Sequence, residues 1–358
     1  MRLALRNIVH DRLRFLLGIG GIAFSAFLMI FQGSLLAGFE RAASRVIDSI
    51  DADIWVMPRG VQALDFAPPL RAGYWGVVKG VAGVGSVHEV AAGLAFWQRP
   101  NGTRKTVVVV GTESGMAPVL PESVMVDASD LHTLGLTGLP VEIEINSHRR
   151  RVERSVSGFG SFLGSPYIFG KLTDAREALG LGEQGAMFLV LRVDGRSLAA
   201  TQAELRERLP ELDVLKKNEF SARAKWYWTM ETGAGGALLT AALLGFVVGV
   251  LIVSQIVYAT TMENIEEFAT LKALGASHGF VIRIVVTQAF ISAIVGCAAG
   301  MGISIPMTSM ARRFIAWVYT PWELFVALTA ATLLLAILAS ITAVRAALGV
   351  EPGRVFRA

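Results

Sequence analysis

The stretch from Ala237 to Thr260 reads ALLTAALLGFVVGVLIVSQIVYAT and contains no charged side chain. About 20 apolar residues in a helix cover the hydrocarbon core of a bilayer, so this run predicts a transmembrane helix. It continues into TMENIEEFATLKALGASHG (261–279), which has four charges, a broad apolar stripe and a glycine stop. This second segment is too polar for lipid and too regular for a loose linker. A membrane helix with a structured appendage suggests a protein that transmits force between two compartments.

The composition points to an integral membrane protein with a soluble portion. The chain has 358 residues, of which 53% are hydrophobic and only 17% charged. This is too apolar for an ordinary soluble protein. The net charge of +4 is mild and requires no nucleic-acid partner. The excess is concentrated in four runs, which predict transmembrane helices at 15–39, 237–260, 281–306 and 323–344.

The segments between these runs complete the predicted organisation. Residues 1–14 (MRLALRNIVHDRLR) predict a basic amphipathic helix, and positive charge before a first span favours a cytoplasmic N-terminus. Residues 40–236 predict a periplasmic domain with helical stalks. The remaining segments are expected to be a cytoplasmic helix and loop, a short outer loop and a cytoplasmic tail, at 261–280, 307–322 and 345–358. The chain is thus expected to be a multi-pass protein of the bacterial inner membrane, with both termini cytoplasmic.

The predicted domain mixes helices and strands, which favours an α+β fold rather than a barrel or a sandwich. Asn101-Gly102 lies between two extended runs, 84–98 and 104–111, and predicts a hairpin because both residues tolerate positive φ. A second hairpin is predicted for 141–146 and 150–157. Further strands are predicted at 51–58, 166–169, 186–193 and 212–216, and helices at 71–79, 173–179, 197–209 and from Asn218 onward.

Two aromatic clusters flank the apolar runs. Trp226, Tyr227 and Trp228 precede the second run, and Trp317, Tyr319 and Trp322 precede the fourth. Aromatic side chains concentrate at membrane–water interfaces, so matching positions favour an interfacial belt; the alternative is that they fill a domain core. Arg149-Arg150-Arg151 is interpreted as a solvated hairpin strand, with a docking patch as the alternative.

The apolar runs themselves are almost free of ionisable groups. Ion-coupled transporters keep such groups at membrane depth, so their scarcity argues against a secondary transporter. Gly245–Gly249 and Gly296–Gly300 have the four-residue spacing that lets helices approach closely. This spacing predicts helix packing, either within the chain or between chains.

No motif for catalysis or metal binding stands out. Cys297 is the only cysteine, which excludes an intrachain disulfide and a cysteine-based metal site, and the five histidines are scattered. The sequence contains no G-x-x-x-x-G-K-[ST] loop for ATP hydrolysis. We therefore expect no enzyme activity, no metal and no cofactor in this chain.

The segment EEFATLKALGAS (266–277) closely resembles the signature that follows the second span in the MacB/FtsX superfamily of ABC transporter permeases. The architecture of one span, a large domain and three further spans is similar too. DADIWVMP (51–58), AKWYW (224–228) and GFVVGVLIVSQIV (245–257) are most similar to the DevC-type branch. The chain departs from the wider superfamily, which commonly has Arg-Glu-Ile-Gly where this sequence has Glu266-Glu267-Phe268-Ala269.

The resemblance implies the permease subunit of an ABC-type exporter. Such a permease forms a dimer and binds two separate ABC ATPase subunits, which hold the ATP and Mg²⁺. ATP-driven motion is relayed outward by mechanotransmission, driving efflux of a lipid, glycolipid, drug or peptide. A periplasmic adaptor (a membrane fusion protein) and an outer-membrane channel are the further partners implied, beside the lipid bilayer. Homodimer and heterodimer both remain open.

The same resemblance assigns 263–275 as the coupling helix that contacts the ATPase. An apolar face would fit a groove of the ATPase, a charged rim would surround it, and Gly275 would end the helix in a left-handed cap. The apolar face consists of Ile265, Phe268, Leu271 and Leu274, and the rim of Glu263, Glu266, Glu267 and Lys272.

Two alternatives share this architecture. One is an FtsX-like signalling protein whose outer domain activates a cell-wall hydrolase without transporting anything. The other is a permease that extracts lipoproteins from the membrane.

Overall fold

The computed structural model describes residues 12–71, 73–99, 102–113, 122–183, 185–263, 265, 267, 270–271 and 274–348. The chain divides into two units. The helical unit holds residues 1–37, 237–312 and 318–358, and the sheet unit holds 38–236 and 313–317. The amphipathic helix predicted at 1–14 lies outside the described residues, apart from its last three positions.

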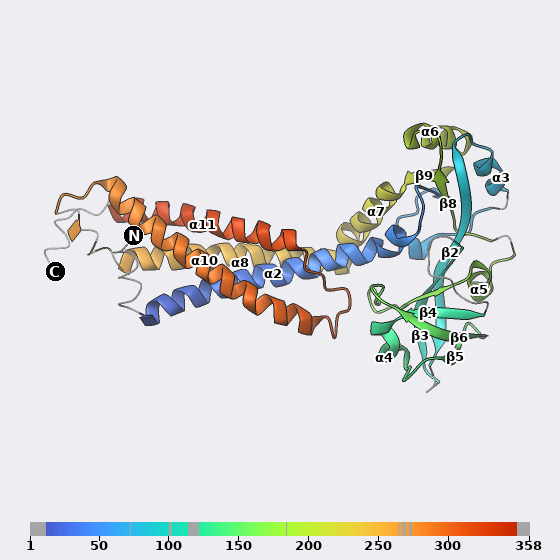
Figure 1. Ribbon diagram of the computed structural model, residues 1–358, viewed down its shortest axis with the longest axis horizontal. Helices are drawn as coiled ribbons and strands as arrows, with labels where there is room; N and C mark the ends of the chain where they lie inside the picture. The colour runs from blue at the N-terminus through green and yellow to red at the C-terminus, as the bar shows by residue number, and fades with distance from the viewer. Residues whose placement is uncertain are drawn as a thin grey trace. The chain divides into compact units, whose positions relative to one another are not determined.

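Four long helices carry the apolar runs. Their bounds are Arg12–Ser49 for α2, Gly233–Glu263 for α8, His278–Ala311 for α10 and Trp322–Leu348 for α11. Each is long and apolar enough to cross a membrane. In the helical unit they lie side by side (Figure 1) and share a core of small and branched side chains. That core comprises Ile22, Val253, Val257, Ala289, Ala293, Ala336 and Ala339.

The loop predicted at 307–322 begins later in the structure, because α10 continues through Pro306 to Ala311. Proline removes one backbone donor from a helix, which normally weakens it. Hydroxyl groups around the proline bond to backbone carbonyls: Ser304 Oγ donates to Gly300 O at 2.7 Å and Thr308 Oγ1 to Ser304 O at 2.8 Å. Such bonds supply local polar partners inside an apolar helix. Within the predicted loop, residues 313–317 belong to the sheet unit.

The sheet unit is built on nine strands in the order β3-β7-β4-β6-β5-β2-β8-β1-β9. Their bounds are Ile54–Pro58 (β1), Val84–Gln98 (β2), Arg104–Thr112 (β3), Ser123–Asp127 (β4), Val141–Ile145 (β5), His148–Val156 (β6), Tyr167–Gly170 (β7), Phe188–Val193 (β8) and Leu212–Lys216 (β9). The helical elements of this unit are η1 (Leu64–Phe66), α3 (Tyr74–Lys79), η2 (Ala128–Asp130), α4 (Leu131–Leu134), α5 (Leu172–Ala178), α6 (Leu198–Arg208), α7 (Lys217–Trp226) and a π-helical turn (Tyr227–Glu231).

The long strand β2 joins two parts of this sheet. Its first half pairs antiparallel with β8, from Val84 to Val90, and its second half pairs with β3, from Val90 to Gln98. Figure 1 shows β2 running through both parts. The β8 side is an open sheet that ends at β9. Its core includes Ile54, Val56, Leu191, Leu205 and Val214, so α6 packs against this part through Leu205.

On the other side, the pairings close on themselves. β2 pairs with both β3 and β5, and the path β3-β7-β4-β6-β5 returns to β2. Six strands therefore form a closed circuit within the mixed α/β domain, a connection that the sequence did not predict. Closure depends on the parallel pairs β3–β7 and β4–β6. Parallel pairs join segments distant in sequence and leave no hairpin turn to read.

The predicted architecture is confirmed: one apolar helix, a mixed α/β domain and three further apolar helices. Both predicted hairpins are present, as β2–β3 and β5–β6. Strand β4 was not predicted. Its five residues are all buried, and two of them, Ser123 and Asp127, are polar. Between these polar ends only three apolar residues remain, which is too short a run to predict a strand.

The interpretation of Arg149–Arg151 as a solvated strand is wrong for the middle residue. Arg150 lies on β6, and only 7% of its side chain is exposed. Its Nε is 3.5 Å from Asp174 Oδ1 and its Nη2 forms an ion pair with Glu177, both carboxylates belonging to α5. Alternation along a strand directs every second side chain to the same face, which places Arg150 inward and its two neighbours outward.

Candidate functional site

The segment between α8 and α10 holds the predicted coupling helix. Among the coupling-helix residues, Glu266, Phe268 and Lys272 lie outside the described residues, and the structure describes the other six. Glu263 and Glu267 are exposed, and Ile265 is half-buried. Two acidic side chains of the predicted rim therefore lie on the surface of the helical unit.

The end of this segment has the geometry of a glycine cap. Gly275 adopts φ +90°, in the left-handed region that favours glycine. Ala276 N donates to Leu271 O at 3.0 Å, the long hydrogen bond of a Schellman motif. Ser277 then begins α10, because its Oγ accepts from Phe280 N at 3.3 Å. The chain thus turns between two helices through consecutive caps, as the predicted glycine stop requires.

The predicted apolar face is divided between two environments. Leu271 packs against Val281 and Val285 of α10. Leu274 is 81% exposed. A leucine of this exposure has no packing role in the chain itself, so Leu274 is the described apolar residue of the segment that is most accessible to a partner.

The paired glycines pack within the chain. A Cβ at Gly245 or Gly249 would lie 3.1 Å from Gln32 Cγ or 3.0 Å from Met29 Cγ, so both glycines face α2. Gly296 and Gly300 face the same helix. Their Cβ atoms would lie 2.5 Å from Ile22 Cγ2 and 2.6 Å from Ala23 O. The four glycines therefore let α8 and α10 approach α2, which selects the intrachain alternative for these positions.

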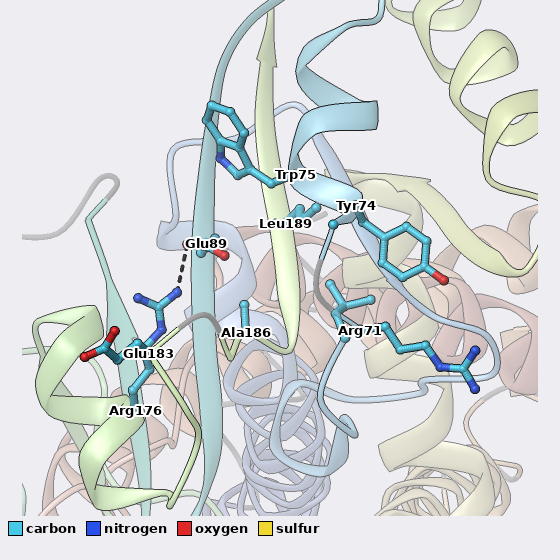
Figure 2. A pocket seen from close by; sticks show the side chains of 10 residues that line it. Arg71, Tyr74, Trp75, Glu89, Arg176, Glu183, Ala186 and Leu189 are labelled. Carbon is cyan, nitrogen blue, oxygen red and sulfur yellow. Dashed lines mark hydrogen bonds and ion pairs between the residues drawn. The ribbon is translucent and has the colours of Figure 1, made fainter.

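The sheet unit contains a cavity of about 330 Å³ beside the midpoint of β2 (Figure 2). Arg176 Nη2 is 2.8 Å from Glu89 Oε2, and Arg176 Nε donates to Gly185 O at 2.7 Å. Trp75 and Leu189 supply apolar surface, whereas the ends of Arg71 and Tyr74 point away from the ion pair. The guanidinium of Arg176 is engaged by two groups of the chain itself, which favours a role in joining α5 to β2.

Two carboxyl groups of the sheet unit have a pKa that burial raises to about 6. Burial raises the pKa of Asp65 to about 6, and the Tyr167 hydroxyl, 3.4 Å from Oδ1, opposes that shift. Burial also raises the pKa of Asp130 to about 6, against the opposing effect of a hydrogen bond from Ser161. Asp130 is 2% exposed and its Oδ2 has no hydrogen-bond partner. Across the described residues, no group of three or more His, Cys, Asp or Glu side chains has the arrangement of a metal site.

The aromatic clusters prove to be mixed. Trp226 and Trp322 are exposed, as side chains of an interfacial belt would be. Trp228 is buried, with its ring centroid 5.0 Å from that of Phe162, and Trp317 packs 5.8 Å from Phe39. Trp228 therefore follows the alternative interpretation and fills a core in the sheet unit, and the half-buried Trp317 packs on a ring of the same unit.

The family model that matches this chain covers most of the helical unit. Residues 239–352 match the family model of the FtsX-like permease C-terminal domain. This range includes α8, the capped segment at Gly275, α10 and α11.

Full-length relatives and solved structures were found as well. Proteins of Mycobacterium bovis and Mycobacterium tuberculosis, each described as an uncharacterised ABC transporter permease, are 24% identical over 99% of this chain and 98% of their own length. The periplasmic region of MacB from Actinobacillus actinomycetemcomitans aligns with 48% of this chain and 92% of its own, at 11% identity and a TM-score of 0.36. The extracellular domain of the transporter YknZ from Gram-positive bacteria aligns with 46% and 98%, at 12% identity and a TM-score of 0.33.

These matches confirm the predicted resemblance to FtsX-like permeases over residues 239–352, whereas the DevC-type branch stays a prediction. The chain therefore carries an FtsX-like permease domain at residues 239–352 and is a homologue of ABC transporter permeases.

Proposed function

We propose that this chain is the permease subunit of an ABC-type exporter and relays the motion of a separate ATPase to its sheet unit. The observation that carries the proposal is the capped helical segment before α10, which displays Glu263, Glu267 and Leu274 within the FtsX-like domain. A segment that exposes side chains between two membrane helices and ends in a helix cap is suited to transmit the movement of a partner protein to both helices.

The proposal fixes an orientation. Residues 261–280 and both termini would lie in the cytoplasm, where ATPase subunits bind ATP and Mg²⁺, and residues 38–236 would lie in the periplasm. Four crossings of a bilayer place the two termini on one side, in agreement with this arrangement. The chain would hold no nucleotide of its own.

Two copies of the permease would assemble with two ATPase subunits. The outward face of α8 is available to lipid or to a second copy of the chain, because its large apolar side chains stay exposed although the helix is the most apolar of the four. Leu243, Leu244, Val247 and Leu251 are among them. A periplasmic adaptor and an outer-membrane channel would complete the export path for a lipid, glycolipid, drug or peptide.

Leu274→Asp tests the coupling segment. The side chain is 81% exposed, so the substitution should leave folding and membrane insertion intact. We expect the affinity-purified variant to lose most of the ATPase that accompanies the wild-type chain from native membranes, since a charge would enter an apolar contact. Phe96→Asp is the matched control, because Phe96 is 55% exposed on β2 of the sheet unit.

Full retention of the ATPase by Leu274→Asp would contradict the assigned contact. Export itself is tested in a strain that lacks the chain. In that strain the exported molecule should accumulate in the cell or its inner membrane and be depleted outside. A strain in which cell-wall cleavage fails and nothing accumulates would instead support the signalling alternative.

A further inference from the structure

Five aromatic rings from distant parts of the sequence meet in the sheet unit. We call this set the aromatic junction. Trp228 contacts Phe162 and Phe66 at centroid distances of 5.0 and 5.9 Å. Phe39 contacts Phe162 and Trp317 at 5.0 and 5.8 Å. All of these contacts lie within the sheet unit.

Three of the five rings belong to the segments that connect this unit to apolar helices. Phe39 is part of α2, which is one continuous helix from Arg12 to Ser49. Trp228 lies in the π-helical turn that ends just before α8, and Trp317 lies in the segment between α10 and α11. Helices that cross a bilayer in alternating directions bring all three connections to the same membrane surface. The junction therefore lies where the chain enters and leaves the bilayer.

The other two rings come from loops that the sequence places far from any apolar helix. Phe66 ends η1, and Phe162 lies in the loop between β6 and β7. This second loop is fixed by more than its aromatic ring. Arg45 of α2 donates to Gly158 O at 3.3 Å and its guanidinium carbon lies 5.2 Å from the centroid of the Phe159 ring. A Cβ at Gly160 would lie 2.5 Å from Ala316 Cβ, so the loop also packs closely on the segment between α10 and α11.

Around the junction, large apolar side chains are exposed instead of buried. Phe66 is 54% exposed and Leu163, next to the buried Phe162, is 45% exposed. Further exposed apolar residues on the connecting segments are Trp226, Met230 and Phe314. In water, exposed apolar side chains of this size and number favour aggregation or a binding partner. At a membrane interface, aromatic and aliphatic side chains are stabilised.

The dimensions agree with a place in the interface. A bilayer about 40–45 Å thick with a hydrocarbon core of about 30 Å has an interfacial zone of roughly 5–8 Å on each side. The ring spacings of 5.0–5.9 Å in the junction keep Phe66 and Phe162 within one such thickness of the connecting segments.

We propose that the loops carrying Phe66 and Leu163 form a lipid-contact surface. Both side chains would lie at the boundary between the headgroups and the acyl chains of phospholipids, in the leaflet that the three connections cross. The two loops would then anchor the sheet unit to that leaflet, in addition to its covalent connections. This proposal depends on the membrane-spanning helices and not on export or on an ATPase.

Spin labels at single cysteines test the proposal in the full chain reconstituted in phosphatidylcholine vesicles. Cys297 is the only cysteine, so a Cys297→Ala background allows one label per variant. Phe66→Cys and Leu163→Cys report on the proposed surface. Phe96→Cys and Leu94→Cys are matched controls, because these side chains are 55% and 48% exposed on β2 and belong to no segment of the junction. Oxygen concentrates in lipid, whereas a water-soluble nickel chelate is excluded from it.

We expect the ratio of oxygen to nickel accessibility at positions 66 and 163 to exceed that at positions 96 and 94 several-fold. Equal ratios at all four positions would overturn the proposal. A bimane label at the same positions distinguishes lipid from other cover, since lipids brominated near the glycerol should quench it at 66 and 163. A blue-shifted but unquenched label would show protein or cargo in place of lipid, and would also overturn it. Phe66→Cys removes the ring that contacts Trp228 and could disturb the loop. The label at position 163 tests the proposal without removing that ring.

Discussion

The helical unit and the sheet unit treat apolar side chains in opposite ways. Helix α8 is the most apolar of the four long helices, yet few residues of its apolar part are buried. In the sheet unit, strands β4 and β7 are buried at every position. Water drives apolar side chains inward, whereas lipid gives them no reason to leave the surface. Burial therefore identifies the core of the sheet unit, and close backbone approach identifies the packing face of the helical unit.

The two units also differ in how they satisfy polar groups. In the helices, hydroxyls bond to their own backbone, as Ser34 Oγ does to Ile30 O at 2.6 Å. In the sheet unit, polar side chains join different elements, as Arg150 does between β6 and α5. A helix in lipid must satisfy its polar atoms locally, while a water-exposed domain can use them to connect distant segments.

The largest expected effect comes from breaking the polar connection in the sheet unit. Arg150→Ala leaves the buried carboxylate of Asp174 without its cationic partner. Removing one partner of a buried ion pair costs about 3–5 kcal/mol, because the remaining charge stays desolvated. We expect the free energy of unfolding of the sheet unit to fall by that order, measured by denaturant titration of the full chain with a fluorescence signal from Trp55 and its neighbours.

A double variant separates the charge from the packing. Arg150→Met with Asp174→Leu removes both charges and keeps apolar volume, and it should recover most of the loss. If the double variant is as unstable as Arg150→Ala, then packing of the arginine stem stabilises this connection and the ion pair does not. Arg149→Ala, on the outward face of the same strand, should change stability by less than about 0.5 kcal/mol.

In the helical unit, the contact between α10 and α2 is broken by adding a bulky side chain. Gly300→Leu would place a Cβ 2.6 Å from the Ala23 carbonyl oxygen, and that backbone atom cannot rotate away. Overpacking of this kind costs about 1–3 kcal/mol, and the rigid neighbour favours the upper end. Denaturation in mixed bicelles should show the loss. Gly302→Leu is the control, since a Cβ there meets no atom within 4 Å. Equal stability of the two variants would show that α10 does not depend on its contact with α2.

The sequence predicted the features that depend on local signals and missed those that depend on contacts between distant segments. The apolar runs, the two hairpins and the glycine cap at Gly275 are local signals, and each has its counterpart in the structure. The closed circuit of strands depends on parallel pairings between distant segments, and the burial of Arg150 depends on its contacts with two carboxylates of α5. The predicted coupling segment is intermediate. Its exposed Leu274 agrees with an apolar face for a partner, but Leu271 is taken up by α10, and no sequence pattern distinguishes the two leucines.

The smallest expected change in stability comes from two buried aspartates, of which one has all its hydrogen-bond partners and the other lacks one. Asp127 and Asp130 lie three residues apart and are both buried. Asp127 accepts from Ser129 N at 2.9 Å, Ser129 Oγ at 2.6 Å and Phe159 N at 2.7 Å, whereas Asp130 Oδ2 has no partner. We expect Asp130→Asn to stabilise the sheet unit near pH 7 and Asp127→Asn to destabilise it, because an amide nitrogen would then face a backbone donor.

The pH dependence of Asp130→Asn identifies the cause. Burial raises the pKa of Asp130 from 3.8 to about 6, so the folded state holds the proton more tightly than the unfolded state. Stability from this group is then full below about pH 4, falls as the pH rises from 4 to 6, and stays lower above 6. The shift corresponds to about 3 kcal/mol at about 1.4 kcal/mol per pKa unit, and we expect roughly half of it from the variant because its amide also stays buried. Unfolding curves should therefore show the variant more stable than wild type at pH 7 and less stable by about 1 kcal/mol at pH 4, where wild type has regained the stability of its protonated Asp130 and the variant has not changed. An advantage that persists at pH 4 would mean that the gain does not come from the charge of Asp130.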